Sequence, residues 1–447
     1  MVKFNRLLFM SALFLIWFSA CSMQEKDFDP RPAHQWQTLG DGAWCWFSDP
    51  RAIYYQGEKE QSYVGWVDTV GNIIIASYDH QSGDIEKFIL HEKLQRDDHN
   101  VPSILVRPDG RLLVFYSKHG GDEFYTRLSR NPESVAEWYP VRTLPLNENE
   151  IYADSLLRDY TYSHPFQLSA ENNRTFLFWR GINRKPCVSI SEDGGENWSK
   201  GKIVIRPDDI YKHRRPYVKY FSNDEDKIYL SFTDGHPRKE PENSIYYACY
   251  QQGAFYRADG SKITDFAKIP FKPLDADVVY NARETRVRAW VWDIATDRKG
   301  RPVILYTRLP DFKDHRYHYA IWNGHQWLDH EIVAGGGWFP QTLAGKRESE
   351  RHYSAGLVLD RADPSVVYLS RPVNGVFEIE RWQTSDMGKS WQSTPVTRQS
   401  KYDNVRPFVS WNAPQTIKPR LFWMTNLNYI HYSNYASLIR MDMPIVP

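Results

Sequence analysis

An eight-residue turn pattern that occurs twice is the strongest constraint on the fold of this chain. Residues 191–198 read Ser-Glu-Asp-Gly-Gly-Glu-Asn-Trp, and residues 384–391 read Thr-Ser-Asp-Met-Gly-Lys-Ser-Trp. In each copy the aspartate can accept backbone N–H bonds across a tight hairpin, the glycine permits a positive φ angle, and the tryptophan covers the side of the turn. The pattern therefore predicts pairs of short antiparallel strands.

Short strand-like runs recur along the whole chain. Each run is rich in Val, Ile, Tyr, Phe or Trp and is bounded by Gly, Asp, Asn or Pro, whereas a sustained 3.6-residue period is almost absent. Strands at this spacing without intervening helices indicate a sandwich, a barrel or a propeller. Examples of the runs are Ser62–Val67, Ile73–Tyr78, Leu112–Tyr116, Thr175–Trp179, Ile228–Phe232, Pro302–Thr307 and Val366–Leu369.

The turns favour the propeller among these three architectures. The two octapeptides are Asp boxes, which join the outer two strands of a blade in sialidases and many other propellers. Weaker turn signals at 107–110, 296–300 and 359–364 also precede strand-like runs. Since a four-stranded blade takes about 40–50 residues, we predict an all-β, seven-bladed β-propeller in one domain spanning residues 37–447, with eight blades as the alternative.

The N-terminus has the layout of a bacterial lipoprotein signal. Lys3 and Arg6 precede the apolar run Leu7–Phe18, and small residues then lead to Cys21. We predict a signal peptide over 1–20, an acylated Cys21 and a tether over 21–36. The protein is then exported and lipid-anchored to a bacterial membrane, at the cell surface or in the periplasm; the alternative is an ordinary signal peptide with Cys21 nearby by chance.

Charge and composition exclude several other functions. The net charge of +1 gives no electrostatic reason to expect nucleic acid as a partner, and no second run of about 18 apolar residues is present, so contact with the membrane is expected only through the anchor. The sequence has no nucleophile elbow, P-loop or dinucleotide fingerprint, and we predict no organic cofactor. The 17 Trp and 28 Tyr residues suit both a β-sheet core and the stacking of sugars.

Six stretches resemble one group of Asp-box propellers, the BNR-repeat family of ulvan lyases and related α-L-rhamnosidases. The resemblance implies a polysaccharide lyase that cleaves rhamnose–uronate linkages of an anionic polysaccharide by β-elimination. Two alternatives stay open: an α-L-rhamnosidase acting on rhamnose–glucuronate glycans, and a carbohydrate-binding lipoprotein without catalysis. The stretches are Trp44–Ala52, Asp98–Asn100, Phe178–Gly181, Arg215–Tyr220, Thr233–Arg238 and Asp403–Pro407.

A lyase of this kind needs a base for the C5 proton, an acid for the leaving oxygen and a cation for the carboxylate. His99 follows two aspartates, and His119 comes one turn and one strand later. We assign His99 as the general base and His119 as a second catalytic or binding histidine. The resemblance also implies a catalytic tyrosine, which corresponds either to Tyr162 or to the position of His164.

Arginines are the natural partners of a substrate carboxylate or sulfate. Arg180 closes an otherwise apolar strand, and Arg215 and Tyr217 lie in a basic patch. We predict that all three bind substrate. The alternatives are a structural ion pair for Arg180 and an exposed charged loop for the patch.

The resemblance further implies a structural Zn²⁺. His213, His236 and Cys249 are the candidate ligands, and Cys187 is a weaker one. Because no compact Cys-x-x-Cys spacing is present, the alternative is a buried thiol beside a turn histidine.

Overall fold

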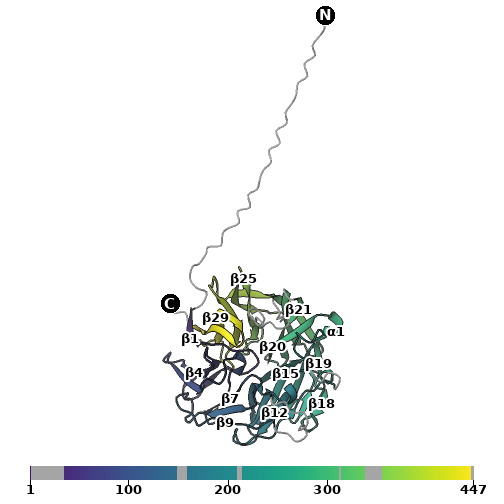
Figure 1. Ribbon diagram of the computed structural model, residues 1–447. Coiled ribbons are helices and arrows are strands. Elements are labelled where there is room, and N and C mark those ends of the chain that lie inside the picture. The colour runs from purple at the N-terminus through teal and green to yellow at the C-terminus, as the bar shows by residue number, and fades with distance from the viewer. Residues whose placement is uncertain (2–34, 148–158, 209–213, 312–313, 338–354, 444–447) are drawn as a thin grey trace, which may run out of the picture. The chain divides into compact units, whose positions relative to one another are not determined.

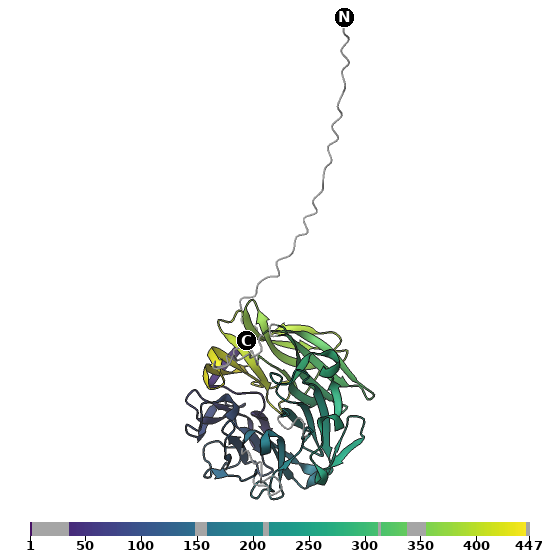
Figure 2. The same ribbon diagram turned by 45° about the vertical axis from the view of Figure 1, so that its right-hand side comes forward.

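The computed structural model describes Met1 and residues 35–147, 159–208, 214–311, 314–337 and 355–443. In this part of the chain the strands form seven sheets. The sheets follow one another in chain order around a common axis (Figures 1 and 2). The prediction of an all-β, seven-bladed propeller is confirmed.

Blades 1 to 4 lie in the first two thirds of the chain. Blade 1 contains β2 (Ala52–Gln56), β3 (Glu60–Val67), β4 (Ile73–Asp79) and β5 (Ile85–His91), and blade 2 contains β6 (Ser103–Val106), β7 (Leu112–Ser117), β8 (Phe124–Leu128) and β9 (Arg142–Thr143). Blade 3 contains β10 (Thr161–Leu168), β11 (Arg174–Arg180), β12 (Pro186–Ser191) and β13 (Lys202–Ile203). Blade 4 is larger, with β14 (Val218–Ser222), β15 (Lys227–Thr233), β16 (Ile245–Gln251), β17 (Ala254–Tyr256), β18 (Lys262–Asp265) and β19 (Asp277–Tyr280), which pairs with β16.

Blades 5 and 6 have four strands each, and blade 7 closes the ring. Blade 5 contains β20 (Arg288–Thr296), β21 (Pro302–Asp311), β22 (Asp314–Trp322) and β23 (Trp327–Gly336), and blade 6 contains β24 (Leu357–Leu359), β25 (Val366–Val373), β26 (Val376–Gln383) and β27 (Gln392–Pro395). Blade 7 contains β28 (Asp403–Val409), β29 (Leu421–His431), β30 (Asn434–Met443) and β1 (Gln35–Asp41). The helical pieces are short: η1 (Asp98–Asn100), η3 (Ser169–Glu171), η4 (Ile182–Arg184), η6 (Phe266–Lys268), η7 (Pro273–Asp275) and α1 (Ala282–Thr285).

Blade 7 is built from both ends of the described chain. β1 pairs with β30 in antiparallel register, from Gln35 opposite Met443 to Asp41 opposite Leu438. Because β1 begins at Gln35, the last two residues of the predicted tether belong to this blade. The predicted signal peptide and the lipidation site Cys21 lie outside the described residues, and both stay predictions. Among the described residues, no helix is long and apolar enough to span a membrane.

The first Asp box connects β12 to β13 in blade 3. Asp193 Oδ1 accepts from Asn197 N (2.9 Å), and Ser191 Oγ accepts from Gly195 N (2.8 Å). Gly195 has a φ of +95°, and a Cβ atom there would meet a side chain of blade 2 at 2.5 Å. Trp198 Nε1 donates to the carbonyl of Gly195 (3.1 Å). The box therefore fixes its turn in the way the sequence predicts.

The second Asp box, between β26 and β27, repeats this geometry. Asp386 Oδ1 accepts from Ser390 N (2.9 Å), and Trp391 Nε1 donates to Gly388 O (2.9 Å). The ring of Trp391 packs edge-on against Tyr319 of blade 5, with 5.3 Å between the ring centroids. Each Asp box thus ties the outer edge of its blade to the preceding blade.

The strand order divides the turns between the two ends of the propeller axis. The chain enters each inner strand at one end, which we call the upper end, and the second and third strands are connected there too. The connections from first to second and from third to fourth strand, including both Asp boxes, lie at the lower end. Residues placed before an inner strand or after a second strand therefore meet at the upper end.

The core accounts for many of the aromatic residues. Trp44, Trp66, Trp179 and Trp423 are among the largest fully buried side chains. The cysteines of the described residues, Cys45, Cys187 and Cys249, are all free and buried, so they form no disulfide framework.

Candidate active site

A polar pocket of about 170 Å³ opens at the upper end of the propeller. Its side chains come from segments far apart in the sequence, because six of the seven blades contribute residues from before or within the inner strand, or from the end of the second strand and the turn after it. The pocket is lined by Cys45, Trp46, Phe47, Asp98, His99, His119, Tyr162, Arg180, Arg215, Tyr217, His236, Arg238, Trp290, Arg406 and Tyr432. Six of these are residues that the sequence predicts as catalytic or substrate-binding.

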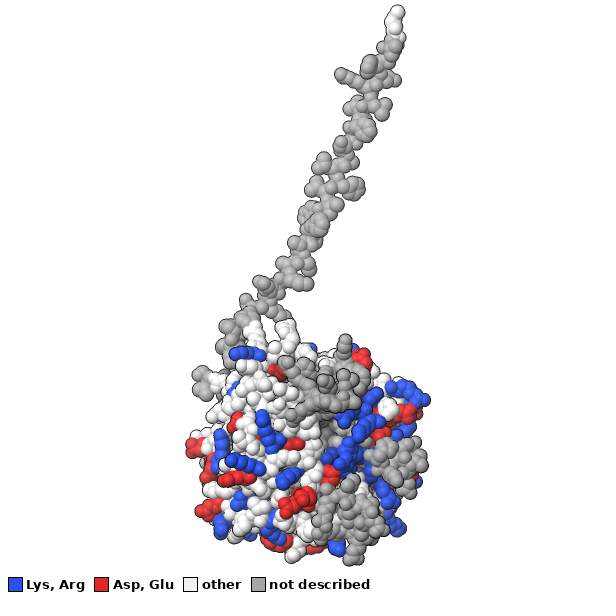
Figure 3. Space-filling model, viewed as in Figure 1, with Lys and Arg blue, Asp and Glu red and all other residues white. Residues whose placement is uncertain are grey.

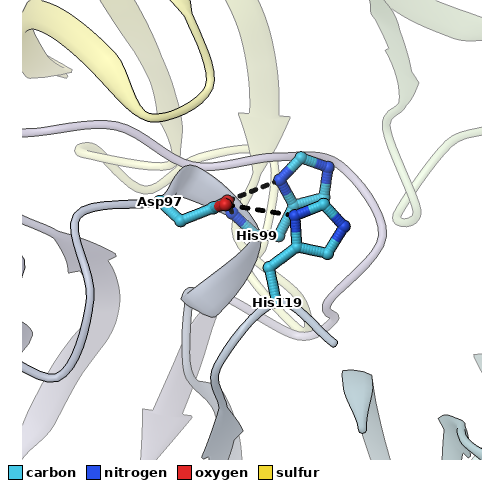
Figure 4. Close-up of side chains that lie close together, drawn as sticks. All are labelled: Asp97, His99 and His119. Carbon is cyan, nitrogen blue, oxygen red and sulfur yellow. Dashed lines mark hydrogen bonds and ion pairs between the residues drawn. The ribbon is translucent and has the colours of Figure 1, made fainter. Parts of the chain in front are cut away.

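Two histidines on one wall share a single carboxylate. Asp97 precedes η1 and accepts from the backbone N–H of His99 (2.9 Å), which fixes the start of this helix. Its Oδ1 lies 2.7 Å from His99 Nδ1, and its Oδ2 lies 3.1 Å from His119 Nδ1. The two imidazole rings are stacked, with centroids 3.9 Å apart and planes 12° from parallel (Figure 4).

Local backbone geometry holds His119 against β10. Gly120 has a φ of +70°, and its N–H donates to the carbonyl of Tyr160 (3.1 Å) and to Thr161 Oγ1 (2.9 Å). A Cβ atom at position 120 would lie 2.6 Å from Asp159 Oδ1. The turn directly after His119 therefore requires glycine.

Sharing Asp97 fixes the tautomer of both rings. A carboxylate only accepts hydrogen bonds, so Nδ1 of each ring donates to it. The Nε2 atoms lie on the opposite side of the rings from Asp97 (Figure 4). When such a ring is neutral, its Nε2 carries a free lone pair and can accept a proton.

The two histidines differ in charge. Burial lowers the pKa of His99, but the carboxylates of Asp97 and Asp98 beside its Nδ1 outweigh this and raise it well above 6.5. Burial and the charge of His99 lower the pKa of His119 to about 4, although Asp97 opposes both. At neutral pH His99 is therefore cationic and His119 is neutral. A cationic ring has no free lone pair for a proton, so these pKa shifts favour His119 over His99 as the general base.

Asp98 connects His99 to the far end of the chain. Its Oδ1 lies 3.0 Å from His99 Nδ1, while its Oδ2 accepts from Arg406 Nη1 and from the Tyr429 hydroxyl, each at 2.5 Å. Asp98 and Arg406 are both fully buried, which makes this ion pair insensitive to salt. The sequence motifs at 98–100 and 403–407 pointed to both residues, but without showing that they touch.

Tyr162 lies beside His99, with 5.7 Å between the ring centroids, in an unusual backbone conformation. Its φ is +59°, and the register of β10 against β11 shifts between Thr161 and Ser163. Such a bulge reverses the normal alternation of side chains. Burial raises the pKa of Tyr162 well above 10, despite His99 and Arg180, so the phenol is protonated. Its hydroxyl makes no hydrogen bond within the described residues, and it is free to donate to a ligand.

His164 lies behind the pocket wall and does not line the pocket. Its Nδ1 accepts from the backbone N–H of Asp49 (3.3 Å), and its ring packs on Tyr220 with centroids 4.7 Å apart. Burial lowers its pKa to about 3, so it is a neutral core residue. Of the two positions considered for the family's tyrosine, the structure therefore brings Tyr162 to the pocket.

Arg180 is a buried cation without a carboxylate partner in the part of the chain that the structure describes. Nη1 donates to the Tyr217 hydroxyl and Nη2 to Thr161 Oγ1, both at 3.1 Å. The guanidinium lies over the ring of Tyr162, 4.7 Å from its centroid, and its Nε has no hydrogen-bond acceptor. The structural ion pair considered for Arg180 is absent there. A buried cation with neutral partners and an unused donor is suited to an anionic ligand.

Arg215 and Tyr217 contribute to the next part of the wall. Arg215 lines the pocket and makes no hydrogen bond or ion pair with described residues. Tyr217 packs at 5.2 Å from Trp290 and 5.6 Å from His236. The same pocket therefore offers a cationic group and an aromatic surface, a combination that suits a charged sugar.

The positive charge of the pocket is local. Among its lining residues, Asp98 is the one carboxylate, and Arg406 already neutralises it. On the face seen in Figure 3, by contrast, acidic and basic side chains are mixed over much of the surface, and Lys and Arg gather mainly to the right of the centre. The pocket can therefore attract an anionic ligand, although the protein as a whole is nearly neutral.

The predicted zinc ligands are not brought together. His236 follows β15 at the upper end and lines the pocket, whereas Cys249 pairs with Tyr229, four residues below the Ile245 end of β16. That is about 13 Å along the strand. His213 lies outside the described residues, and Cys187 Sγ donates to Lys185 O (3.3 Å) in blade 3. His236 and Cys249 cannot bind one ion together, and zinc binding itself stays a prediction.

Fold and site together define an Asp-box β-propeller with a cationic pocket on its axis. The chain belongs to the BNR repeat-containing family, whose sequence profile matches residues 61–334. By sequence, no curated protein matches it.

Two solved structures share the fold over nearly the whole chain. An ulvan lyase, a polysaccharide lyase bound to -[GlcA(1-4)Rha3S]-, has a TM-score of 0.68 and 15% identity, over 92% of this chain and 95% of its own. The polysaccharide lyase Uly1 has a TM-score of 0.56 and 11% identity, over 90% and 92%. At these identities the likeness establishes the common fold.

Proposed function

We propose that the protein is a polysaccharide lyase that cleaves rhamnose–uronate linkages in an ulvan-like polymer by β-elimination. The observation that carries this proposal is the pairing of Arg180, a buried cation without an anionic partner, with a neutral imidazole and a protonated phenol in one pocket. These are the three groups that elimination from a uronate requires. The ulvan lyase of the same fold supports the choice of polymer.

Each residue has its own role in the reaction. Arg180 binds the uronate carboxylate and so makes the C5 proton more acidic. His119 Nε2 takes that proton, the electron pair forms the C4–C5 double bond, and the bond from C4 to the glycosidic oxygen breaks. The Tyr162 hydroxyl gives its proton to the departing oxygen. Cationic His99 stabilises the negative charge that develops on the carboxylate side, and Asp97 keeps both rings in place.

The pocket fits elimination better than hydrolysis by the common glycosidase route. That route needs two carboxyl groups facing the scissile bond. The pocket lining offers Asp98 alone, and its carboxylate is held by Arg406 and Tyr429. The α-L-rhamnosidase therefore remains the second candidate, without an observation of its own in its favour.

Digestion of ulvan and of rhamnose–glucuronate oligosaccharides tests the proposal. A lyase gives products with the ultraviolet absorbance of a conjugated unsaturated uronate and releases no free rhamnose. A rhamnosidase releases rhamnose without that absorbance, and a binding protein does neither. Either of the last two results would overturn the proposal.

The charges of the two histidines predict the pH profile. Elimination needs neutral His119, whose pKa is about 4, and cationic His99, whose pKa is raised well above 6.5. We expect kcat/KM to fall below about pH 4 as His119 gains a proton, to stay level through neutral pH, and to fall again in alkaline solution as His99 loses its proton. Initial rates across this range, with a folded-state check by circular dichroism, measure it. A profile that rises only above pH 7 would contradict these roles.

A further inference from the structure

A buried ion pair beside the active-site pocket joins the segment before blade 1 to the inner strand of blade 4. Lys219 Nζ donates to Asp49 Oδ2 and to the carbonyl of Trp46. Both charged side chains are almost completely buried, at 2% and 0% exposure. Neither has a part in the proposed elimination, although the sequence singles out both of the stretches that carry them, 44–52 and 215–220.

Lys219 holds a segment that no sheet supports. Residues 44–51 lie between β1 and β2 and belong to no strand, so their course depends on individual contacts. The two groups that Lys219 contacts flank Phe47, with Trp46 directly before it and Asp49 two positions after it. One side chain of blade 4 therefore fixes the backbone on both sides of Phe47.

Further contacts hold Asp49 in place. Its backbone N–H donates to His164 Nδ1 (3.3 Å), and its Oδ1 lies 3.4 Å from Arg51 Nη1. Asp49 is therefore the anchor of the segment, and Lys219 links this anchor to Trp46.

The segment brings two aromatic rings to the pocket. Trp46 and Phe47 both line it. Trp46 stacks on Trp292 of blade 5, with centroids 4.4 Å apart and planes 23° from parallel. The ring centroid of Phe47 lies 5.3 Å from that of Tyr162 and 5.1 Å from that of Tyr217. Phe47 thus packs against two of the pocket's tyrosines at once.

These two tyrosines connect Phe47 to the reacting groups. Tyr162 is the proposed acid, and the Tyr217 hydroxyl accepts from Arg180 Nη1 (3.1 Å). The centroids of the two tyrosine rings lie 6.0 Å apart, so the three rings form a closed cluster. A shift of Phe47 would therefore change the distance between the proton donor and the group that binds the carboxylate.

We infer that Lys219 is a positioning residue of the active site: it fixes Phe47, and through Phe47 the spacing of Tyr162 and Arg180. The inference rests on the proposed function, in which these last two groups act together on one uronate. Lys219 itself does not line the pocket. Its loss is therefore expected to act on the rate through the ring of Phe47.

Two variants and a matched control test the inference. The test variant carries Lys219→Met with Asp49→Asn, which removes one buried charge of each sign. Lys219→Gln, which leaves Arg51 beside Asp49, is a milder second variant in case the double replacement prevents folding. The control carries Arg420→Met with Asp360→Asn and so removes another buried ion pair, in which Arg420 Nη1 and Nη2 donate to Asp360 at 2.7 and 2.6 Å at the lower end. Each is made in the full chain, and its melting temperature is measured first.

We expect the test variant to lower kcat/KM for elimination about a hundredfold and Lys219→Gln to lower it about tenfold, since misplacing a reacting group by about 1 Å has effects of this size. The control should stay within about twofold of wild type. In a protein that already carries Phe47→Ala, the double replacement should lower kcat/KM less than about threefold, because the contact through which it acts is already lost. Exchange of backbone amide hydrogens should become faster in residues 44–51 of the test variant and stay unchanged there in the control.

Three results would each overturn the inference: a test variant within about twofold of wild type, a loss in the control as large as in the test variant, or an undiminished loss on top of Phe47→Ala. Failure of the proposed function looks different. If the wild-type protein forms no unsaturated product, the lyase assignment falls, while amide exchange in residues 44–51 still decides whether Lys219 holds the segment. Unchanged exchange there would overturn that step as well.

Discussion

Replacement of His119 by alanine is expected to lower kcat/KM for elimination about a thousandfold, within the range that a general base contributes. The reason is that His119 is the neutral ring of the stacked pair, and Asp97 holds its Nδ1 so that Nε2 faces away from the carboxylate. The rate is measured from the ultraviolet absorbance of the unsaturated product. His325→Ala, which removes an exposed histidine from blade 5, is the matched control and should leave the rate unchanged.

His99→Gln separates the roles of the two histidines. The charge of His99 is one of the causes that hold the pKa of His119 down. Without that charge the pKa of His119 rises, and the acidic limb of the kcat/KM profile should move to higher pH. Two results together would show that His119 is not the base. The acidic limb would stay in place in His99→Gln, and His119→Ala would lower kcat/KM less than tenfold.

Replacement of Arg180 by alanine is expected to cost about a thousandfold in kcat/KM, since removal of a single buried group that stabilises developing charge costs about a hundredfold to a thousandfold. Arg180 is the buried cation nearest the protonated Tyr162, and in the described structure neutral hydroxyls are its partners. Arg180→Lys keeps the positive charge but loses the planar guanidinium that can bind both oxygens of a carboxylate. Its kcat/KM should therefore lie between that of the wild type and that of Arg180→Ala. Arg184→Ala, which removes a half-exposed arginine paired with Asp159, is the nearby control.

A substrate change tests the same contact from the other side. Methyl esterification of the uronate removes the anion that Arg180 is proposed to bind. If the proposal is correct, Arg180→Ala lowers the rate on the acid strongly and on the ester little, since the interaction is already lost there. Equal losses on acid and ester would place Arg180 in a structural role.

The Asp boxes made the fold predictable from the sequence, because their hydrogen bonds lie within eight residues. The hydrogen bonds of Asp193, Gly195 and Trp198 all stay within residues 191–198, so no distant part of the chain needs to be known to predict the turn. Blade count followed from length and strand spacing. The pairing of β1 with the last blade could not be predicted from local sequence, because its partner strand β30 lies some four hundred residues further along the chain.

The site was predictable in its residue types and less so in their roles. His99, His119, Arg180 and Tyr217 follow or precede strands that the sequence shows, and the fold brings them to one end. The charge of His99, however, depends on how deeply the ring is buried, which the sequence does not show. The position of Tyr162 depends on a bulge that no local pattern signals. Two of the predicted zinc ligands, Cys249 and His236, lie apart because strand register is not visible in spacing alone.

The contact of Asp98 with Arg406 and Tyr429 has a consequence for the timing of activity during biosynthesis. These residues are separated by 308 and 331 positions, so a nascent chain holds Asp98 and His99 long before their partners are synthesised. A partly made chain lacks the two residues that hold Asp98 in place beside His99. The proposed elimination is therefore expected to appear only once the last blade has closed.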